Sequence, residues 1–173
     1  MFVPPLELSL VRAMSGAPDG PGATTQLTVG LSWASLYPKP TPVDVQIGVV
    51  VTTVPVRGER LLARASEPVD TECLAGGYVL VAARGAAGRH WRTWMAARGE
   101  LVDLGDDPGL GAAARASIEL WVGDTHRDEH VHGIGVGAIS AWAELGVREQ
   151  PADGVATFVA AGLGFRLPLM VLL

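Results

Sequence analysis

The 173-residue chain is predicted to be an all-β protein whose strands form a sandwich or a barrel. Apolar and polar residues alternate with a period of two in several segments, which is the pattern of a strand with two different faces. Turn sequences rich in glycine and proline, such as SGAPDGPGA and PADG, separate many of these segments. Threonine and the β-branched aliphatic residues dominate the first third of the chain, as strands prefer.

The N-terminal third contains the clearest predicted strands. Leucines at positions 6, 8 and 10 alternate with Glu7 and Ser9. Residues 24–36 follow, where Leu27, Val29, Leu31 and Trp33 face one way and Gln26, Thr28 and Ser32 face the other. Three prolines in YPKPTP then interrupt regular pairing. The alternation restarts with valine or isoleucine at positions 43, 45, 47, 49 and 51.

Later segments extend the series to about eight strands. The candidates are ERLLARA, GYVLVAAR, ASIELWVG, GIGVGAISAWAEL, VATFVAAGL and FRLPLMVLL. The region 89–116 is open to two interpretations: RHWRTWMAARGELVDL fits a hairpin strand or a helix, and GLGAAARAS fits a strand or a short helical turn. No repeat or linker divides the chain, so residues 1–173 are predicted to be one domain.

The composition predicts more apolar surface than a soluble monomer needs. Apolar residues make up 49% of the chain and charged residues 18%, below the usual charged share of about 25%. Some of this surface is therefore expected to be buried against partner chains or a membrane. The N-terminal residues do not resemble a signal peptide.

The C-terminal residues 155–173 are the membrane candidate in the sequence. Arg166 lies inside this apolar run, where a central arginine costs about 2.5–3.5 kcal/mol on insertion scales. The glycines at positions 162 and 164 divide the run in two. We therefore predict two short buried strands here rather than a membrane-spanning helix.

Charge and cysteine content argue against several functions. The net charge is −5 and no basic block occurs, so nucleic acid is not expected as a direct partner. Residues 89–94, RHWRTW, interleave arginine with tryptophan, but we interpret them as partly buried tryptophans with arginines at an edge or interface. The five tryptophans are expected to be mostly core residues. The single cysteine, Cys73, is predicted to be a small buried hydrophobic residue.

Residues 123–135, GDTHRDEHVHGIG, contain the sequence's candidate metal ligands, His126, His130 and His132. On a strand, His130 and His132 would project from the same face and could bind zinc or iron. The jelly-roll enzymes called cupins use such a pair, followed by a glutamate and a later histidine. Here glycines and aliphatic residues follow His132, the next glutamate is Glu144, and no further histidine occurs. The prediction is therefore an exposed connection whose histidines could titrate at a subunit contact. We assign no catalytic, cofactor-binding or metal-binding residue and expect no enzyme activity.

The strand series from LELSLVRAM to LPLMVLL runs through a chain with no asparagine, three glutamines, and one lysine against twelve arginines. In length, strand series and amide-poor composition the whole chain resembles the smaller single-β-barrel major capsid protein of tailless, membrane-containing icosahedral double-stranded DNA viruses of thermophilic bacteria (sphaerolipovirus type). The resemblance implies a single jelly roll of about eight strands. It also implies a structural virion protein, assembled in the host cytoplasm, that contacts itself, a larger coat protein and the internal viral membrane.

Two other functions stay open at this point. A decoration or carbohydrate-binding module would share a β-sandwich. A cupin-like metalloenzyme would need bound metal. For the capsid interpretation, we predict that the purified chain is at least a dimer.

Overall fold

A computed structural model describes residues 5–13, 23–33, 42–55, 71–103, 108–122, 137–150 and 154–166. Eight strands run through these residues: β1 (Pro5–Ala13), β2 (Ala23–Ser32), β3 (Val43–Pro55), β4 (Thr71–Ala87), β5 (Trp91–Asp103), β6 (Pro108–Val122), β7 (Gly137–Gln150) and β8 (Gly154–Arg166). The prediction of an all-β chain with about eight strands is confirmed. The predicted segment ERLLARA lies outside the described residues.

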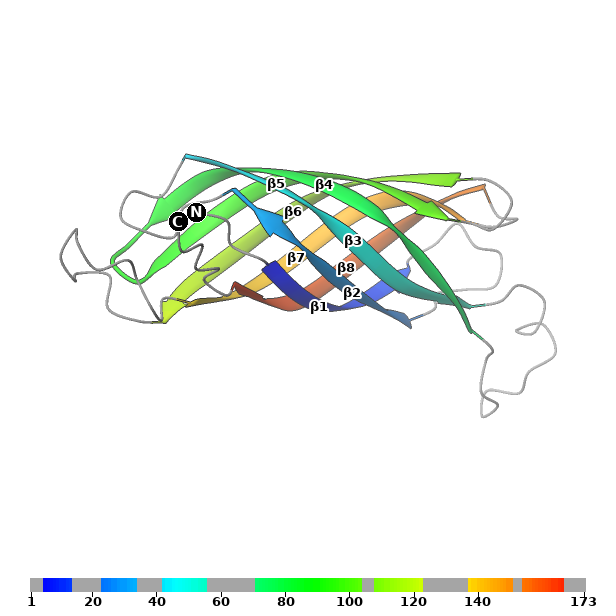
Figure 1. Cartoon of the computed structure of the whole chain (residues 1–173), viewed down its shortest axis with the longest axis horizontal. Coiled ribbons are helices and arrows are strands. Elements are labelled where there is room, and N and C mark those ends of the chain that lie inside the picture. Colours follow the sequence, from blue (N-terminus) through cyan, green and yellow to red (C-terminus); the bar gives the residue numbers. More distant parts are fainter. Residues whose placement is uncertain are drawn as a thin grey trace, which may run out of the picture.

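Each strand pairs antiparallel with the next strand along the chain. The first strand also pairs with the last, from Pro5 opposite Arg166 to Ala13 opposite Phe158, and this pairing closes the sheet into a barrel (Figure 1). This order is that of an up-and-down barrel. A jelly roll requires Greek-key crossings between strands that are distant in sequence. The expected jelly-roll connectivity therefore differs from the observed one, because period-2 alternation reveals strands but not which strands pair.

In the region 89–116, the described residues form strands and no helix. Residues 91–103 and 108–122 form β5 and β6, which pair along their whole length. The C-terminal prediction of two short strands is wrong in one respect, because residues 154–166 form one strand that continues through Gly162 and Gly164. Both glycines pair with β1 and β7, so neither interrupts the strand. Residues 167–173 lie outside the described part of the chain.

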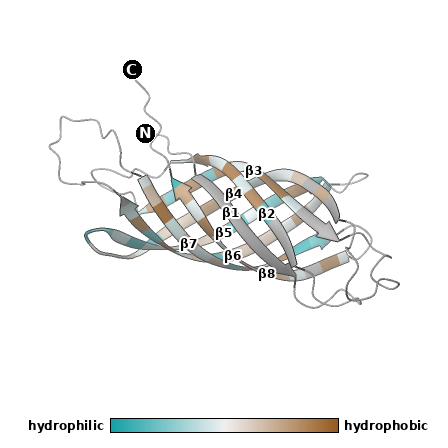
Figure 2. Ribbon diagram, turned by 90° about the horizontal axis from the view of Figure 1, so that it is seen from below, coloured by the Kyte–Doolittle hydropathy of each residue, from teal (hydrophilic) through white to brown (hydrophobic). Residues whose placement is uncertain are grey.

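The two faces of the sheet differ in chemistry: the outer face is mainly apolar, whereas the inner face carries the charged side chains together with apolar clusters that include Val50 and Phe158. Aliphatic side chains such as Val29, Val49 and Leu163 are exposed on the outer face. Gln26, Arg98 and Glu144, which alternate with apolar neighbours on their strands, are buried inside. The alternating hydropathy along single strands can be followed in Figure 2. This arrangement is the reverse of a soluble sandwich, in which the apolar face is buried.

Aromatic side chains inside the barrel fill the space left by glycines on neighbouring strands. Gly30, Gly48 and Tyr78 are consecutive cross-strand partners on β2, β3 and β4. A Cβ atom at Gly48 would lie 2.8 Å from Cε1 of Tyr78, and one at Gly30 would lie 2.6 Å from its Oη. The tyrosine ring therefore lies across both glycines, as in the pairing of glycine with an aromatic residue that stabilises curved sheets.

Replacing this ring tests its packing role. We expect Tyr78→Ala to lower the free energy of unfolding by about 3 kcal/mol, because the side chain is buried and two glycines cannot fill the cavity. Denaturant titration measures the change. Val79→Ala, on the outer face of the same strand, is the control and should cost less than half as much. Equal effects at the two positions would contradict the proposed packing.

Candidate functional site in the barrel interior

The interior holds a network of buried ion pairs in two groups. The first charge cluster comprises Ser32, Asp44, Gln46, Arg92, Glu119 and Arg166, drawn from β2, β3, β5, β6 and β8. Arg166 connects it: Nη1 lies 2.9 Å from Asp44 Oδ2, and Nε lies 2.7 Å from Glu119 Oε1. Arg92 also donates to Glu119. Ser32 donates to Asp44 at 2.7 Å, and Gln46 donates to the same carboxylate at 2.9 Å.

The second charge cluster comprises Gln26, Arg98, Glu100, Arg115, Glu144 and Arg148. Glu144, whose side chain is fully buried, lies between two arginines: Oε1 is 3.2 Å from Arg98 Nη1, and Oε2 is 2.8 Å from Arg115 Nε. Glu100 joins Arg98 to Arg148, because it pairs with Arg98 at 2.8 Å and also with Arg148. Arg148 reaches across the interior and donates to Gln26 Oε1 at 2.8 Å.

The arginine planes also stack on aromatic rings. The guanidinium carbon of Arg115 lies 4.0 Å from the centroid of Trp142, and that of Arg92 lies 4.4 Å from Trp121. Similar contacts join Arg98 to Tyr78 and Arg148 to Phe158, each at 5.0 Å. A guanidinium group can bind a carboxylate along its edge and a ring with its face, so arginine suits a crowded polar interior better than lysine.

The two clusters nearly balance in charge. Among the buried residues described, five arginines face four carboxylates. Burial of isolated charges would be very costly, whereas paired and hydrogen-bonded charges are tolerated. A cavity of about 20 Å³ lies between the clusters, lined in part by Arg115, Ser117, Ser140 and Arg166. That volume holds about one water molecule, so side chains fill the middle of the barrel, as expected for eight strands.

The interior side chains described here are joined by ion pairs, hydrogen bonds and cation–π contacts. Within the described ranges, no group of three or more histidine, cysteine, aspartate or glutamate side chains could hold a metal ion. The candidate ligands His126, His130 and His132 lie outside the described residues, so their metal-binding or contact role stays a prediction. In the part of the chain that is described, no helix is long and apolar enough to cross a membrane.

Several other residues singled out in the sequence occupy unexpected places. Cys73 is exposed, contrary to the predicted burial, because its position on β4 places it on the outer face. Arg92, expected at an edge or interface, is only 1% exposed and faces inward. Trp94 and Trp142 are core residues as expected, whereas Trp33 and Trp91 are exposed on the outside.

Sequence reasoning missed the interior charges as a group, although a signal for them was present. Arg92, Arg98 and Glu100 on β5 are all separated by even numbers of residues, and so are Glu144 and Arg148 on β7. Strand geometry places each set on one face. Opposite charges on one strand face, with apolar residues on the other, are the pattern of a barrel with a polar interior. The ion-pair partners come from distant segments and could not be read from spacing.

The fold and interior define an eight-stranded antiparallel barrel that is apolar outside and charged inside. The solved structure of Neisserial surface protein A is similar, with a TM-score of 0.62, 12% sequence identity and coverage of 97% of both chains. At that identity the similarity shows the fold alone. No family model matches the chain, and no curated protein sequence matches it.

Removing one shared carboxylate tests the second charge cluster. Glu144→Gln should lower the free energy of unfolding by about 3–5 kcal/mol, because Arg98 and Arg115 would lose their buried counter-charge. Glu149→Gln is the matched control: Glu149 accepts a hydrogen bond from the Leu110 amide at an exposed site, and an amide oxygen can replace it. Denaturant unfolding compares the two variants. A small loss for Glu144→Gln would show that this ion-pair group does not stabilise the barrel.

Proposed function

We propose that the chain is a membrane-spanning β-barrel of the outer-membrane type, in which the outer face contacts lipid. The observation that carries the proposal is the reversed polarity of the sheet. Exposed large apolar side chains occur on every strand from β2 to β8, and the buried charged side chains lie in the interior, together with apolar ones such as Leu80 and Phe158. Water would penalise such an outer surface, whereas hydrocarbon requires it. Closure also matters, because a closed sheet leaves no unpaired strand edge in lipid.

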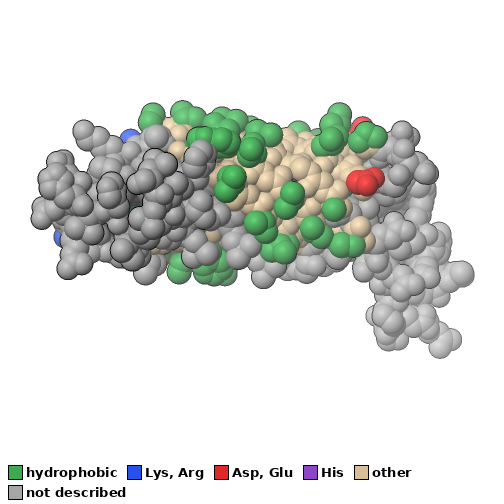
Figure 3. All heavy atoms as spheres, viewed as in Figure 1, with side chains coloured by type: hydrophobic (Ala, Val, Ile, Leu, Met, Phe, Trp, Pro, Cys, Tyr) green, Lys and Arg blue, Asp and Glu red, His purple; other side chains and the backbone are tan. Residues whose placement is uncertain are grey.

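The distribution of outward charges supports a membrane-embedded belt. Among outward-facing strand residues with described side chains, the charged ones are Asp103 and Glu149, and each lies at or next to a strand end. Figure 3 shows hydrophobic side chains over the visible middle of the barrel, with charged groups near its ends. The strands contain 9–17 residues, and a tilted membrane strand needs about 9–11.

Aromatic side chains on the outer face mark one edge of this belt. Trp33, directly after β2, Trp91 at the start of β5 and Phe165 near the end of β8 are all exposed. Antiparallel order brings the end of β2, the start of β5 and the end of β8 to the same end of the barrel. Tryptophan and other aromatic residues favour the boundary between hydrocarbon and headgroups.

The filled interior favours a membrane scaffold over a diffusion pore. Paired arginines and carboxylates occupy the lumen, and the cavity between them is about the size of one water molecule. The structural neighbour is described as a surface protein, and a role at a membrane surface is consistent with this arrangement.

The capsid function predicted from the sequence stays a prediction, together with its partners, its virion localisation and the absence of enzyme activity. Partner subunits could cover part of an apolar surface. A membrane explains better why exposed aliphatic residues surround the barrel on seven strands, because subunit contacts would cover separate patches and leave others in water. The earlier expectation of apolar surface buried against partners or a membrane agrees with this distribution.

Refolding with and without lipid distinguishes the two functions. We expect the urea-unfolded chain to fold into phosphatidylcholine vesicles, float with them in a density gradient and resist carbonate extraction. Without lipid or detergent it should aggregate. A soluble, folded oligomer or particle that forms in lipid-free buffer would contradict the membrane proposal and favour the capsid.

Charged substitutions on one strand face test depth in the bilayer. Val43 and Val49 both point outward from β3, at 50% and 57% exposure, but Val43 is the first residue of the strand. Val49→Arg should cost about 2–4 kcal/mol of stability in vesicles, and Val43→Arg about 0–1 kcal/mol, because the penalty depends on depth. Denaturant unfolding in vesicles measures both. If each variant costs under about 0.5 kcal/mol, as surface changes in water do, this face is not in lipid.

Solute leakage tests the filled lumen. Vesicles that contain the folded barrel should retain a small entrapped dye as well as protein-free vesicles do, because the two charge clusters occupy the interior. Fluorescence dequenching measures release. Rapid dye release from vesicles with correctly folded barrel would indicate an open pore.

A further inference from the structure

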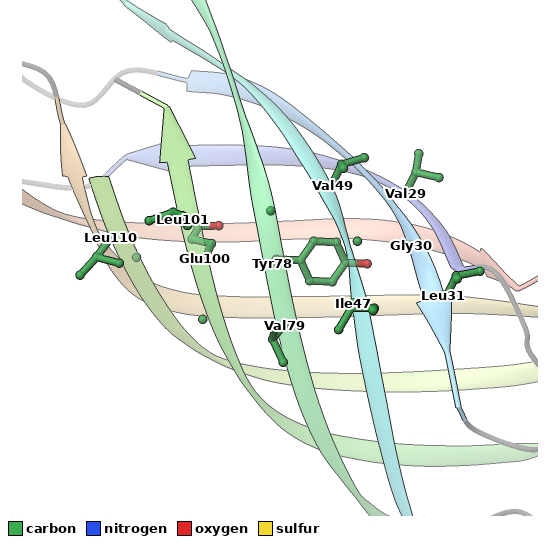
Figure 4. A pocket seen from close by; sticks show the side chains of 14 residues that line it. Val29, Gly30, Leu31, Ile47, Val49, Tyr78, Val79, Glu100, Leu101 and Leu110 are labelled. Carbon is green, nitrogen blue, oxygen red and sulfur yellow. The ribbon is translucent and has the colours of Figure 1, made fainter. Parts of the chain in front are cut away.

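An open groove of about 790 Å³ crosses the outer face of the barrel over strands β2 to β6. Its lining includes the aliphatic side chains of Val29, Ile47, Val79, Leu101 and Leu110, which Figure 4 shows around the centre of the site. The groove lies within the surface that we assign to lipid, and no outward-facing charged side chain lines it.

Two outward-facing glycines, Gly77 and Gly99, form part of the groove. They are diagonal neighbours, because Gly77 pairs with Leu101 and Val79 pairs with Gly99. Each glycine thus lies beside an aliphatic residue on the adjacent strand. This alternation leaves an open depression between raised aliphatic side chains.

The barrel itself does not require glycine at either position. A Cβ atom at Gly99 would meet nothing within 4 Å, and one at Gly77 would meet only the Gly48 carbonyl oxygen at 3.7 Å, an ordinary contact. Inward glycines differ: a Cβ atom at Gly48 would lie 2.3 Å from the Val29 carbonyl oxygen. Glycine weakens the interior of a strand, and it often marks a position where a ligand approaches closely. Since packing within the barrel does not require Gly77 and Gly99, the best explanation for them is room for a molecule on the outer surface.

We infer that this groove binds one acyl chain of a membrane phospholipid, an inference that rests on the proposed membrane location. The outward-facing lining side chains are aliphatic and match a hydrocarbon chain. Glu100 also lines the groove, but its buried carboxylate pairs with Arg98 and Arg148 inside the barrel. The groove is also continuous with the lipid-facing surface, so a chain can enter sideways from the bilayer. A second barrel would present alternating side chains on a twisted sheet, which fit between the aliphatic side chains around Gly77 and Gly99 less well than a polymethylene chain does.

Filling the groove from the protein side tests this inference. The variant Gly77→Leu/Gly99→Leu places two side chains in it without an internal clash. The control Ala141→Leu/Ala143→Leu adds two leucines to exposed outer positions on β7, outside the groove. Each protein is folded into dioleoylphosphatidylcholine vesicles and extracted in mild detergent, and native mass spectrometry counts the phospholipids retained per chain.

We expect one retained phospholipid on the unmodified chain and on the β7 control. For the groove variant, the bound fraction should fall about tenfold, the effect of displacing roughly two buried methylene groups. The groove variant should insert and unfold at the same or a higher denaturant concentration, because glycine is replaced in strand interiors.

Other outcomes separate the two proposals. Equal lipid retention by all three inserted barrels, or no retention by any of them, overturns the acyl-chain site but leaves the membrane location intact. A dimer that only the groove variant loses overturns the site in favour of a second copy. Failure of the unmodified chain to insert overturns the membrane location itself.

Discussion

Charge neutralisation inside a closed barrel is the constraint on which the rest of this structure depends. Closure through the β1–β8 pairing encloses one face of every strand in a space too narrow for bulk water. Among the side chains that the structure describes, five arginines and four carboxylates occupy this space. They can remain there only because nearly every charge faces a partner from another strand, as Glu144 does between Arg98 and Arg115.

This interior also determines what the outer surface must be. A strand has only two faces, and once charged residues take the inner one, the aliphatic residues are displayed outward. Val49 and Leu163, which would form the core of a sandwich, are exposed instead. The reversed polarity is the basis of the proposed membrane location. In that location, the groove that Gly77 and Gly99 line would face lipid.

Glycine serves two different roles in this barrel, and only the sheet register distinguishes them. Gly30 and Gly48 face inward beneath the ring of Tyr78, where a larger residue would collide with neighbouring atoms. Gly77 and Gly99 face outward with room for a side chain. In the sequence the four residues look alike, since each interrupts an alternating segment. Their different functions follow from the neighbours that closure provides.

Local periodicity alone predicts that the chain is all-β and which residues of a strand share a face. The faces of β2 and β3, for example, follow from the alternation of Leu27 with Thr28 and of Ile47 with Gln46. Periodicity does not give the strand bounds: β6 spans residues 108–122, whereas the alternation predicted only ASIELWVG. Only the tertiary structure decided that strands pair in chain order, that the sheet closes, and that the polar face is the inner one. The same alternation of apolar and polar residues occurs along the strands of a soluble sandwich and of a membrane barrel. The distinction lies in long-range contacts such as Arg166 with Asp44 and Arg148 with Gln26, whose partners are separated by more than a hundred residues.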